Sequence, residues 1–239
     1  MSPPMRTIDL NADLGEGCPW DFALLDRVTS ASIGCGAHAG DPPTIRATLE
    51  RAQARGVVVG AHPSYADRGH FGRRDHIMSS DRVCSLILGQ LDDLGAISGP
   101  LGVPIRFLKP HGALYNQAQR EPEIAEGVLA ACRERGLPLV GLPGSFLDER
   151  AAASGLRYLT EGFCDRRYRP DGSLAPRNGP GAILDDPAEV AAQVLRLVDQ
   201  GVDTLCIHGD DPRAVGLVEV VLRTLKAAGL GTRAMSFPG

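Results

Sequence analysis

The sequence of 239 residues predicts an α/β fold in which seven parallel strands and the helices between them form a barrel. Seven short, almost continuously apolar runs predict buried strands, and amphipathic patterns between them predict helices. Polar residues follow nearly every strand, as expected where the carboxyl ends of strands surround a common pocket. In a doubly wound open sheet, only the loops near the switch point would carry such residues. We therefore expect a single (β/α) barrel domain over residues 1–239.

The expected elements alternate along the whole chain. The predicted strands are the runs 7–11, 31–35, 57–61, 105–109, 139–142, 157–162 and 204–208. The helix expected over 41–55 has prolines in its first turn and Gly56 directly after its last residue. A helix starting at Ser80, a helix over 124–135 and apolar stripes at 190–198 and 215–225 complete the pattern.

Composition excludes several classes of protein. The formal net charge is −4 and no basic block is present, which argues against nucleic-acid binding. No apolar leader opens the chain and no apolar run reaches the roughly 18 residues of a membrane span, so we expect neither a signal peptide nor membrane insertion. The six cysteines form no C-x-x-C pair, and we expect reduced thiols in a cytoplasmic protein.

Ionisable and polar residues concentrate just after the predicted strands, where parallel folds place their active sites. Each of the histidines after a predicted strand (His38, His62, His111 and His208), taken alone, could be a hydrogen-bonded loop residue without a catalytic role. Asp41 is equally well placed as a helix N-cap. Four of the six histidines at strand ends favour a shared site. The candidate catalytic residues are Asp13, Glu16, His38, His62, Lys109, His111, Asp165, His208 and Asp210. The candidate substrate-binding residues are Asn11, Asp41, Arg73, Tyr115, Asn116 and Arg166.

The motifs that the sequence lacks narrow the chemistry. It has no Walker A loop, no H-E-x-x-H, no G-x-S-x-G and no G-x-G-x-x-G that opens a helix after a strand. Carboxylates, imidazoles, one lysine and arginines remain, which favours general acid–base or metal-assisted hydrolytic chemistry. Asp13, His38 and His62 are candidate ligands for a divalent metal ion.

Eight segments in order resemble the LamB/YcsF family. They are residues 8–17, 35–42, 60–64, 71–73, 109–116, 165–168, 171–174 and 208–210, of which the first and the Lys-Pro-His-Gly string are the most specific. Ala37 departs from the family pattern, which has Phe there. The resemblance implies a seven-stranded barrel similar to polysaccharide deacetylases. It also implies ATP-dependent opening of 5-oxoproline to L-glutamate, in a complex with subunits B and C of a 5-oxoprolinase.

This reaction suggests roles for individual residues. A lactam is a resonance-stabilised amide, so its opening calls for coupling to ATP, which we expect mainly the partner subunits to bind as co-substrate. Phosphorylation of the amide oxygen by those subunits would leave ring opening to this chain. We assign Asp13 or Glu16 as the base and His62 or His111 as the acid. Lys109 and Arg166 are expected to hold the substrate carboxylate or phosphate.

Two other functions stay open at this point. The first is a metal-dependent amide hydrolase or carbohydrate deacetylase that acts alone, and the second is a binding protein without catalysis. Among the 25 basic residues only Lys109 and Lys226 are lysine. Since Lys109 follows a predicted strand beside Pro110 and His111, we expect Lys109→Arg to impair turnover and Lys226→Arg, on the last helix, to leave it unchanged.

Overall fold

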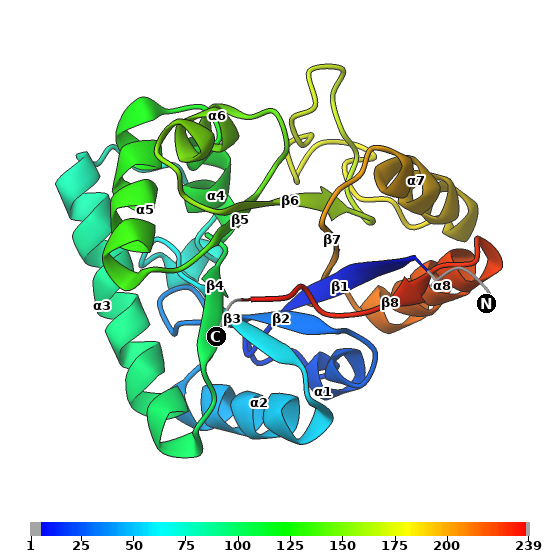
Figure 1. Cartoon of the computed structure of the whole chain (residues 1–239), viewed down its shortest axis with the longest axis horizontal. Coiled ribbons are helices and arrows are strands. Elements are labelled where there is room, and N and C mark those ends of the chain that lie inside the picture. The colour runs from blue at the N-terminus through cyan, green and yellow to red at the C-terminus, as the bar shows by residue number, and fades with distance from the viewer. Residues whose placement is uncertain (1–5, 238–239) are drawn as a thin grey trace.

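Seven parallel strands form a closed ring in the computed structural model, which describes residues 6–237. The strands are β1 (Thr7–Leu14), β2 (Ser30–Gly34), β3 (Val58–His62), β4 (Ile105–Leu108), β5 (Leu139–Gly141), β6 (Tyr158–Phe163) and β7 (Thr204–His208). Their order is β2-β3-β4-β5-β6-β7-β1, and β1 also pairs with β2 (Figure 1). A two-residue strand, β8 (Gly231–Thr232), pairs with the start of β1. The predicted closed barrel is confirmed.

Helices surround the ring of strands (Figure 1). The long ones are α2 (Pro42–Arg55), α3 (Ser80–Ser98), α5 (Pro122–Arg135), α7 (Pro187–Asp199) and α8 (Ala214–Ala227), which confirms all five predicted helices. Gly56 and Gly136 end α2 and α5 with positive φ angles of 69° and 63°, as expected of glycines after a helix. The short helices α1 (Asp21–Leu25), α4 (Gly112–Ala118) and α6 (Phe146–Ala153) were not predicted, nor were the 3₁₀ turns Arg68–His70 and Gly99–Leu101.

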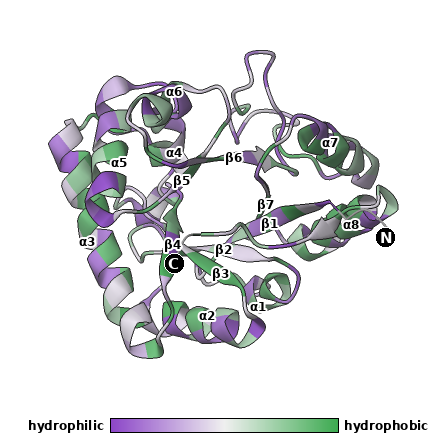
Figure 2. Cartoon of the chain, viewed as in Figure 1, coloured by the Kyte–Doolittle hydropathy of each residue, from purple (hydrophilic) through white to green (hydrophobic). Residues whose placement is uncertain are grey.

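The main hydrophobic core lies between the strands and the helices. Each long helix turns an apolar stripe toward the strands, such as Val190, Val194 and Leu197 of α7, which are all buried. In Figure 2 the outer helices carry both hydrophilic and hydrophobic residues, as expected of helices with one face in solvent. Within the described residues, no helix is long and apolar enough to cross a membrane.

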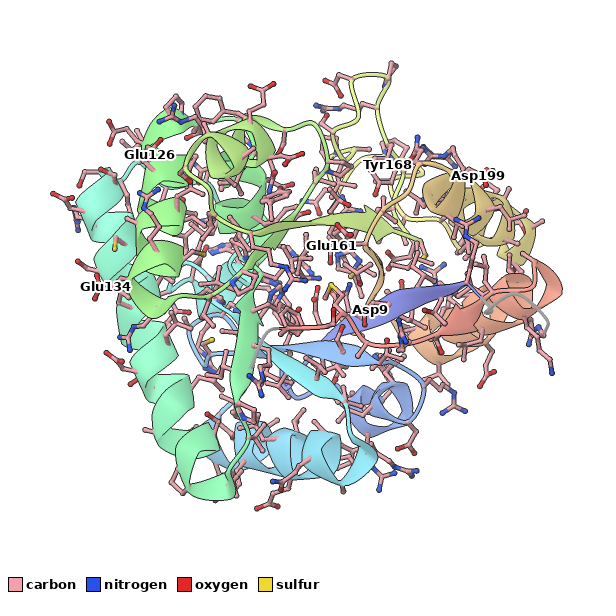
Figure 3. All side chains as sticks on the ribbon, in the orientation of Figure 1. Asp9, Glu126, Glu134, Glu161, Tyr168 and Asp199 are labelled. Carbon is pink, nitrogen blue, oxygen red and sulfur yellow. The ribbon has the colours of Figure 1, made fainter. Side chains whose placement is uncertain are left out.

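The interior of the barrel, in contrast, is polar near β1. Successive side chains of a strand point to opposite faces, so Asp9, Asn11 and Asp13 share the inward face of β1. All three are buried, and each bonds side chains from other strands. Figure 3 shows Asp9 and Glu161 within the ring of strands, whereas Glu126 and Glu134 lie on an outer helix. This row of polar groups leads up to the carboxyl-terminal mouth.

Two glycines allow the loops at this mouth to pack closely. Gly40 has a φ of 74°, and a Cβ there would overlap the carbonyl oxygen of Gly15. A Cβ at Gly209 would overlap the carbonyl oxygen of Asp13. The loops after β1, β2 and β7 therefore approach one another at backbone distance, which brings the side chains that follow these strands together.

Candidate active site

A cavity of about 720 Å³ opens at the carboxyl ends of the strands. Nine of the predicted site residues line it, and they come from the strand ends and the loops that follow them. They are Asp13, His62, Arg73, Lys109, His111, Tyr115, Asn116, Arg166 and His208. Residues of the loop 169–178 and the start of α6 also line it. The structure thus gathers most of the predicted residues in one pocket, as the strand-end pattern indicated.

The remaining predicted residues do not line the cavity. Asn11, Glu16, His38, Asp165 and Asp210 are not among the lining residues but contact groups that are. Asp41 is the N-cap of α2: its carboxylate accepts a hydrogen bond from the Thr44 amide at 2.8 Å, and the residue is exposed. The structure therefore favours the interpretation of Asp41 as a helix N-cap over its interpretation as a substrate-binding residue.

Lys109 lies in the pocket wall, within a buried network of ions. Its Nζ is 2.7 Å from Asp13 Oδ1 and 2.8 Å from Glu161 Oε1. It is also 3.1 Å from Asn11 Oδ1 and 3.2 Å from Cys206 Sγ. Since an ammonium has three N–H donors and four acceptors surround this one, none is left for a substrate anion. The expectation that Lys109 holds the substrate carboxylate or phosphate does not fit this arrangement.

Asp13 and Lys109 stabilise each other's charged form. Burial opposes the ionisation of Asp13, but the charges of His62 and Lys109 outweigh it and hold the pKa of Asp13 well below its usual range. Burial likewise disfavours the charged form of Lys109, yet Asp13 and the other anionic groups raise its pKa well above the usual value. Asp13 therefore stays ionised and is a weak proton acceptor, which argues against its assignment as the base.

His62 and His111 face each other, each with the ring nitrogen that does not bond a backbone carbonyl. His62 Nδ1 donates to the Lys109 carbonyl at 2.7 Å, and His111 Nε2 donates to the Phe71 carbonyl at 2.9 Å. The two other ring nitrogens, His62 Nε2 and His111 Nδ1, lie 3.0 Å apart. In two neutral rings these would both be lone pairs, so a proton or a cation must lie between them. Burial and the neighbouring histidines hold the pKa of His111 well below normal, so His111 is the neutral partner of this pair.

Glu16 and His38, which do not line the pocket, contact this pair. His38 stacks on His111 at a centroid distance of 3.8 Å, and its ring bridges Glu16 Oε1 at 2.9 Å and Ser64 Oγ at 2.8 Å. Burial raises the pKa of Glu16 to about 7 and lowers that of His38 to about 4. Glu16 can therefore exchange a proton near neutrality. It is 3.6 Å from His111 Nδ1 but is not among the residues that line the pocket, which disfavours direct contact with substrate.

His208 and Asp165 form a second imidazole–carboxylate pair. His208 Nδ1 lies 3.0 Å from both oxygens of Asp165, whose second oxygen also accepts from the His208 amide. Burial opposes the ionisation of Asp165, but His208 lowers its pKa below the usual value. The carboxylate holds Nδ1–H in place, so Nε2 of the neutral ring is the free acceptor. The ring also stacks on Phe163 at the pocket wall.

Sequence reasoning missed Glu161 and Cys206 as members of this site. Both point inward and contact Lys109, and Glu161 also accepts from Asn11 Nδ2 at 3.1 Å. The structure places Glu161 inside β6, paired in register with Thr204. A single carboxylate in a predicted buried strand was the signal available.

One carboxylate and two imidazoles are arranged as metal ligands are. A ligand atom from each of Glu16, His62 and His111 lies within 4.8 Å of the other two. The backbone carbonyls that orient both rings are typical outer partners of metal-bound histidine, so these residues fit a divalent cation. Only His62 is shared with the predicted set of Asp13, His38 and His62. The ring nitrogens of His38 are taken by Ser64 and Glu16.

The fold and the site together define a seven-stranded α/β barrel protein with two imidazole–carboxylate assemblies in one pocket. Among solved structures, the family 4 carbohydrate esterase of Streptomyces lividans has this fold, with a TM-score of 0.57 at 13% identity over 97% of this chain and 93% of that one. The model of the LamB/YcsF family matches residues 8–237. The chain belongs to the LamB/YcsF family.

Several full-length relatives agree with this membership. The A subunit of 5-oxoprolinase from Methylococcus capsulatus is 44% identical over 250 residues, or 96% of each chain. That of Neisseria meningitidis serogroup C is 43% identical over 241 residues, covering 95% of this chain and 98% of its own. The solved lactam utilization protein from Thermus thermophilus has a TM-score of 0.87 and 38% identity, over 96% of this chain and 100% of that one.

Proposed function

We propose that this chain is the A subunit of a 5-oxoprolinase and opens the lactam ring of 5-oxoproline to give L-glutamate. Its relatives carry that name over nearly their full length. The observation that carries the proposal is a single pocket with two imidazoles that each contact a carboxylate, one assigned as the general base and the other as the general acid. His208, oriented by Asp165, is the first, and His62, paired with Asp13, is the second. Amide hydrolysis needs one group of each kind.

In this assignment His208 is the base. Its Nε2 accepts a proton from water, whose oxygen forms a bond to the lactam carbon. Asp165 holds the tautomer that leaves Nε2 free and stabilises the imidazolium that results. This replaces Asp13, which its neighbours keep ionised, and Glu16, which lies behind the histidines.

His62 is the acid in the same assignment. Its Nε2 lies 3.5 Å from Asp13 Oδ2 and 3.0 Å from His111 Nδ1, so a proton on Nε2 has two neighbouring acceptors. The proton passes to the ring nitrogen as the carbon–nitrogen bond breaks. Glu16, with a pKa near 7, and His38 are placed to return a proton to the pair through His111.

Tyr115 is the group placed to polarise the lactam carbonyl. Its hydroxyl is buried, has no hydrogen-bond partner in the described part of the chain and belongs to a residue that lines the pocket. Burial and Glu161 raise the pKa of Tyr115 well above normal, so the phenol stays a donor. We assign its O–H to the amide oxygen, which is bonded to the carbon that water attacks.

Coupling to ATP is the second part of the proposal. The sequence has no phosphate-binding P-loop motif, so we assign nucleotide binding, and transfer of the γ-phosphoryl group of ATP to the amide oxygen, mainly to the partner subunits B and C. When the carbon–nitrogen bond then breaks, an acyl phosphate is left, and a second water hydrolyses it to L-glutamate and phosphate. An ATP-consuming reaction also fits the expected cytoplasmic location. The names of the relatives designate one subunit of several, which supports an assembly with further chains.

A reconstitution assay tests this function. We expect the chain with subunits B and C to form glutamate and ADP from L-5-oxoproline and ATP, and neither part alone to do so. Glutamate is measured by an enzyme-coupled assay and ADP by chromatography. Lys226→Arg, an exposed position on α8, is the matched control and should retain wild-type turnover. Glutamate formation that is equally fast without this chain would refute the proposal.

A metal-dependent amide hydrolase is the second candidate, and the facing nitrogens of His62 and His111 favour it specifically. Glu16, His62 and His111 would hold the cation, which would supply Lewis-acid chemistry when bound. In that case His62 Nε2 and His111 Nδ1 would both be metal ligands, and neither would carry a proton.

Metal removal separates the two candidates. We expect a protein dialysed against EDTA, then returned to buffer with Mg–ATP and its partners, to keep its glutamate formation, because a proton suffices between the histidines. Zinc titration by calorimetry gives an independent readout. One zinc per chain, lost in Glu16→Gln but kept in His70→Gln, together with chelator-sensitive activity, would establish the second candidate instead. His70 is exposed and bonds Asp67.

A further inference from the structure

The positive groups around the pocket differ in whether they are already neutralised. Lys109 is surrounded by Asp13 and Glu161. Two other cations, Arg73 and Arg177, both pair with Asp210. These contacts leave Arg166 as the buried, pocket-lining cation without a carboxylate partner in the described residues.

Arg166 is held in place on one side and has a buried donor left over. The residue is 5% exposed and directly follows Asp165 in the loop after β6. Its Nη2 donates to the Ala175 carbonyl at 2.6 Å, which fixes the guanidinium against the loop 169–178. Its Nε is buried and has no hydrogen-bond partner among the described residues. A buried donor without an acceptor is costly, so an acceptor from outside the chain is expected there.

The charge around Arg166 indicates what kind of acceptor fits. Three guanidiniums (Arg73, Arg166 and Arg177) lie near two carboxylates (Asp165 and Asp210). The guanidiniums outnumber the carboxylates by one, and one positive charge matches one carboxylate better than a doubly charged phosphoryl group. Burial and the charge of Arg177 lower the pKa of Arg166, as expected of a cation that lacks its anion.

We propose that Arg166 is the specificity-determining residue that binds the carboxylate of a small cyclic-amide acid, through its free Nε–H. This rests on the proposed function, since it places the carboxylate of 5-oxoproline at Arg166 and the lactam group toward His62 and His208. The site would then select acidic lactams over neutral ones. Lys109, although it lines the same pocket, has no such role because its donors are taken.

A pair of ligands that differ by the carboxylate tests this assignment. L-5-oxoproline and 2-pyrrolidinone share the lactam ring, and only the first carries an anion. Calorimetry on the full-length chain should show tighter binding of L-5-oxoproline. In Arg166→Gln, we expect its affinity to fall about 10- to 100-fold, as for lost hydrogen bonds to a charged group, while that of 2-pyrrolidinone changes less than about 2-fold. Arg166→Lys, which keeps the charge, should retain part of the preference.

Arg167→Gln is the matched control. Arg167 is the next residue, is exposed and pairs with Glu189, so its loss should leave both affinities unchanged. An equal loss of affinity for both ligands in Arg166→Gln, or a wild-type chain without preference for the acid, would overturn the inference. Arg166-dependent binding of inorganic phosphate, with L-5-oxoproline unaffected, would overturn it in favour of a phosphoryl site.

The binding data and the reaction test different statements. Arg166-dependent selection of the acid, without glutamate formation by the reconstituted complex, would keep this inference and refute the proposed function. Glutamate formation with an unchanged KM in Arg166→Gln would keep the proposed function and refute this inference.

Discussion

Lys109→Met is expected to lower the free energy of unfolding by about 3–5 kcal/mol, the usual cost of removing one partner of a buried ion pair. Lys109 is 1% exposed, and its loss would leave Asp13 and Glu161 close together in the barrel without their shared cation. Methionine nearly preserves the volume of the side chain, so the loss would report charge rather than a cavity. Urea denaturation followed by circular dichroism measures it.

Two comparisons make this result specific. Lys226→Met, at the exposed position on α8, should change the unfolding free energy by less than about 0.5 kcal/mol. Adding Glu161→Gln to Lys109→Met should recover part of the loss, because one unpaired carboxylate disappears. A loss below about 1 kcal/mol in the single variant would show that the network does not stabilise the barrel. Lys109→Arg should also impair turnover, since a planar guanidinium does not reproduce the contacts of the compact ammonium with Asn11, Glu161 and Cys206.

Asp165→Asn should lower kcat for glutamate formation by roughly 10⁴-fold, the scale seen when a carboxylate that orients a catalytic histidine becomes an amide. The amide can donate to His208 Nδ1, which would move the ring proton to Nε2 and remove the base from the pocket. Because Asp165 is not among the lining residues, KM should change far less than kcat. Steady-state kinetics of the reconstituted complex give both values.

Asp92→Asn serves as the control for this variant. Asp92 is an exposed aspartate of α3 that pairs with Arg135, away from the pocket. Its kinetics should match those of the wild type. If Asp165→Asn kept more than about a tenth of wild-type kcat while folding normally, His208 could not be the base in this reaction.

The strands and long helices were predictable because their signals are local. Buried parallel strands have continuous apolar character, and α2 and α5 end at Gly56 and Gly136. The helices α1, α4 and α6 have at most eight residues, too few for a clear apolar period. The position of most site residues was also predictable, since parallel strands end on one side of the barrel.

The roles of the site residues were less accessible, because they depend on contacts between distant strands. Glu161 meets Lys109 across 52 positions, and nothing near either residue indicates this partner. Sequence also cannot distinguish Asp41, which caps a helix, from Asp13, which contacts the pocket, since both belong to polar segments at strand ends. Glu16 was assigned as a base from its type, but three-dimensional placement puts His111 and His38 around it.

The register of β1 has a consequence for how the protein acquires activity during folding. Asp13 stands beside His208, and β1 must pair with both β2 and β7 to close the ring. The first and last strands of the ring are therefore joined across nearly the whole chain, a contact that forms slowly and only after synthesis of β7. A nascent or truncated chain that lacks β7 holds His62 and Asp13 without His208. The time at which activity appears during refolding would thus report when the barrel closes.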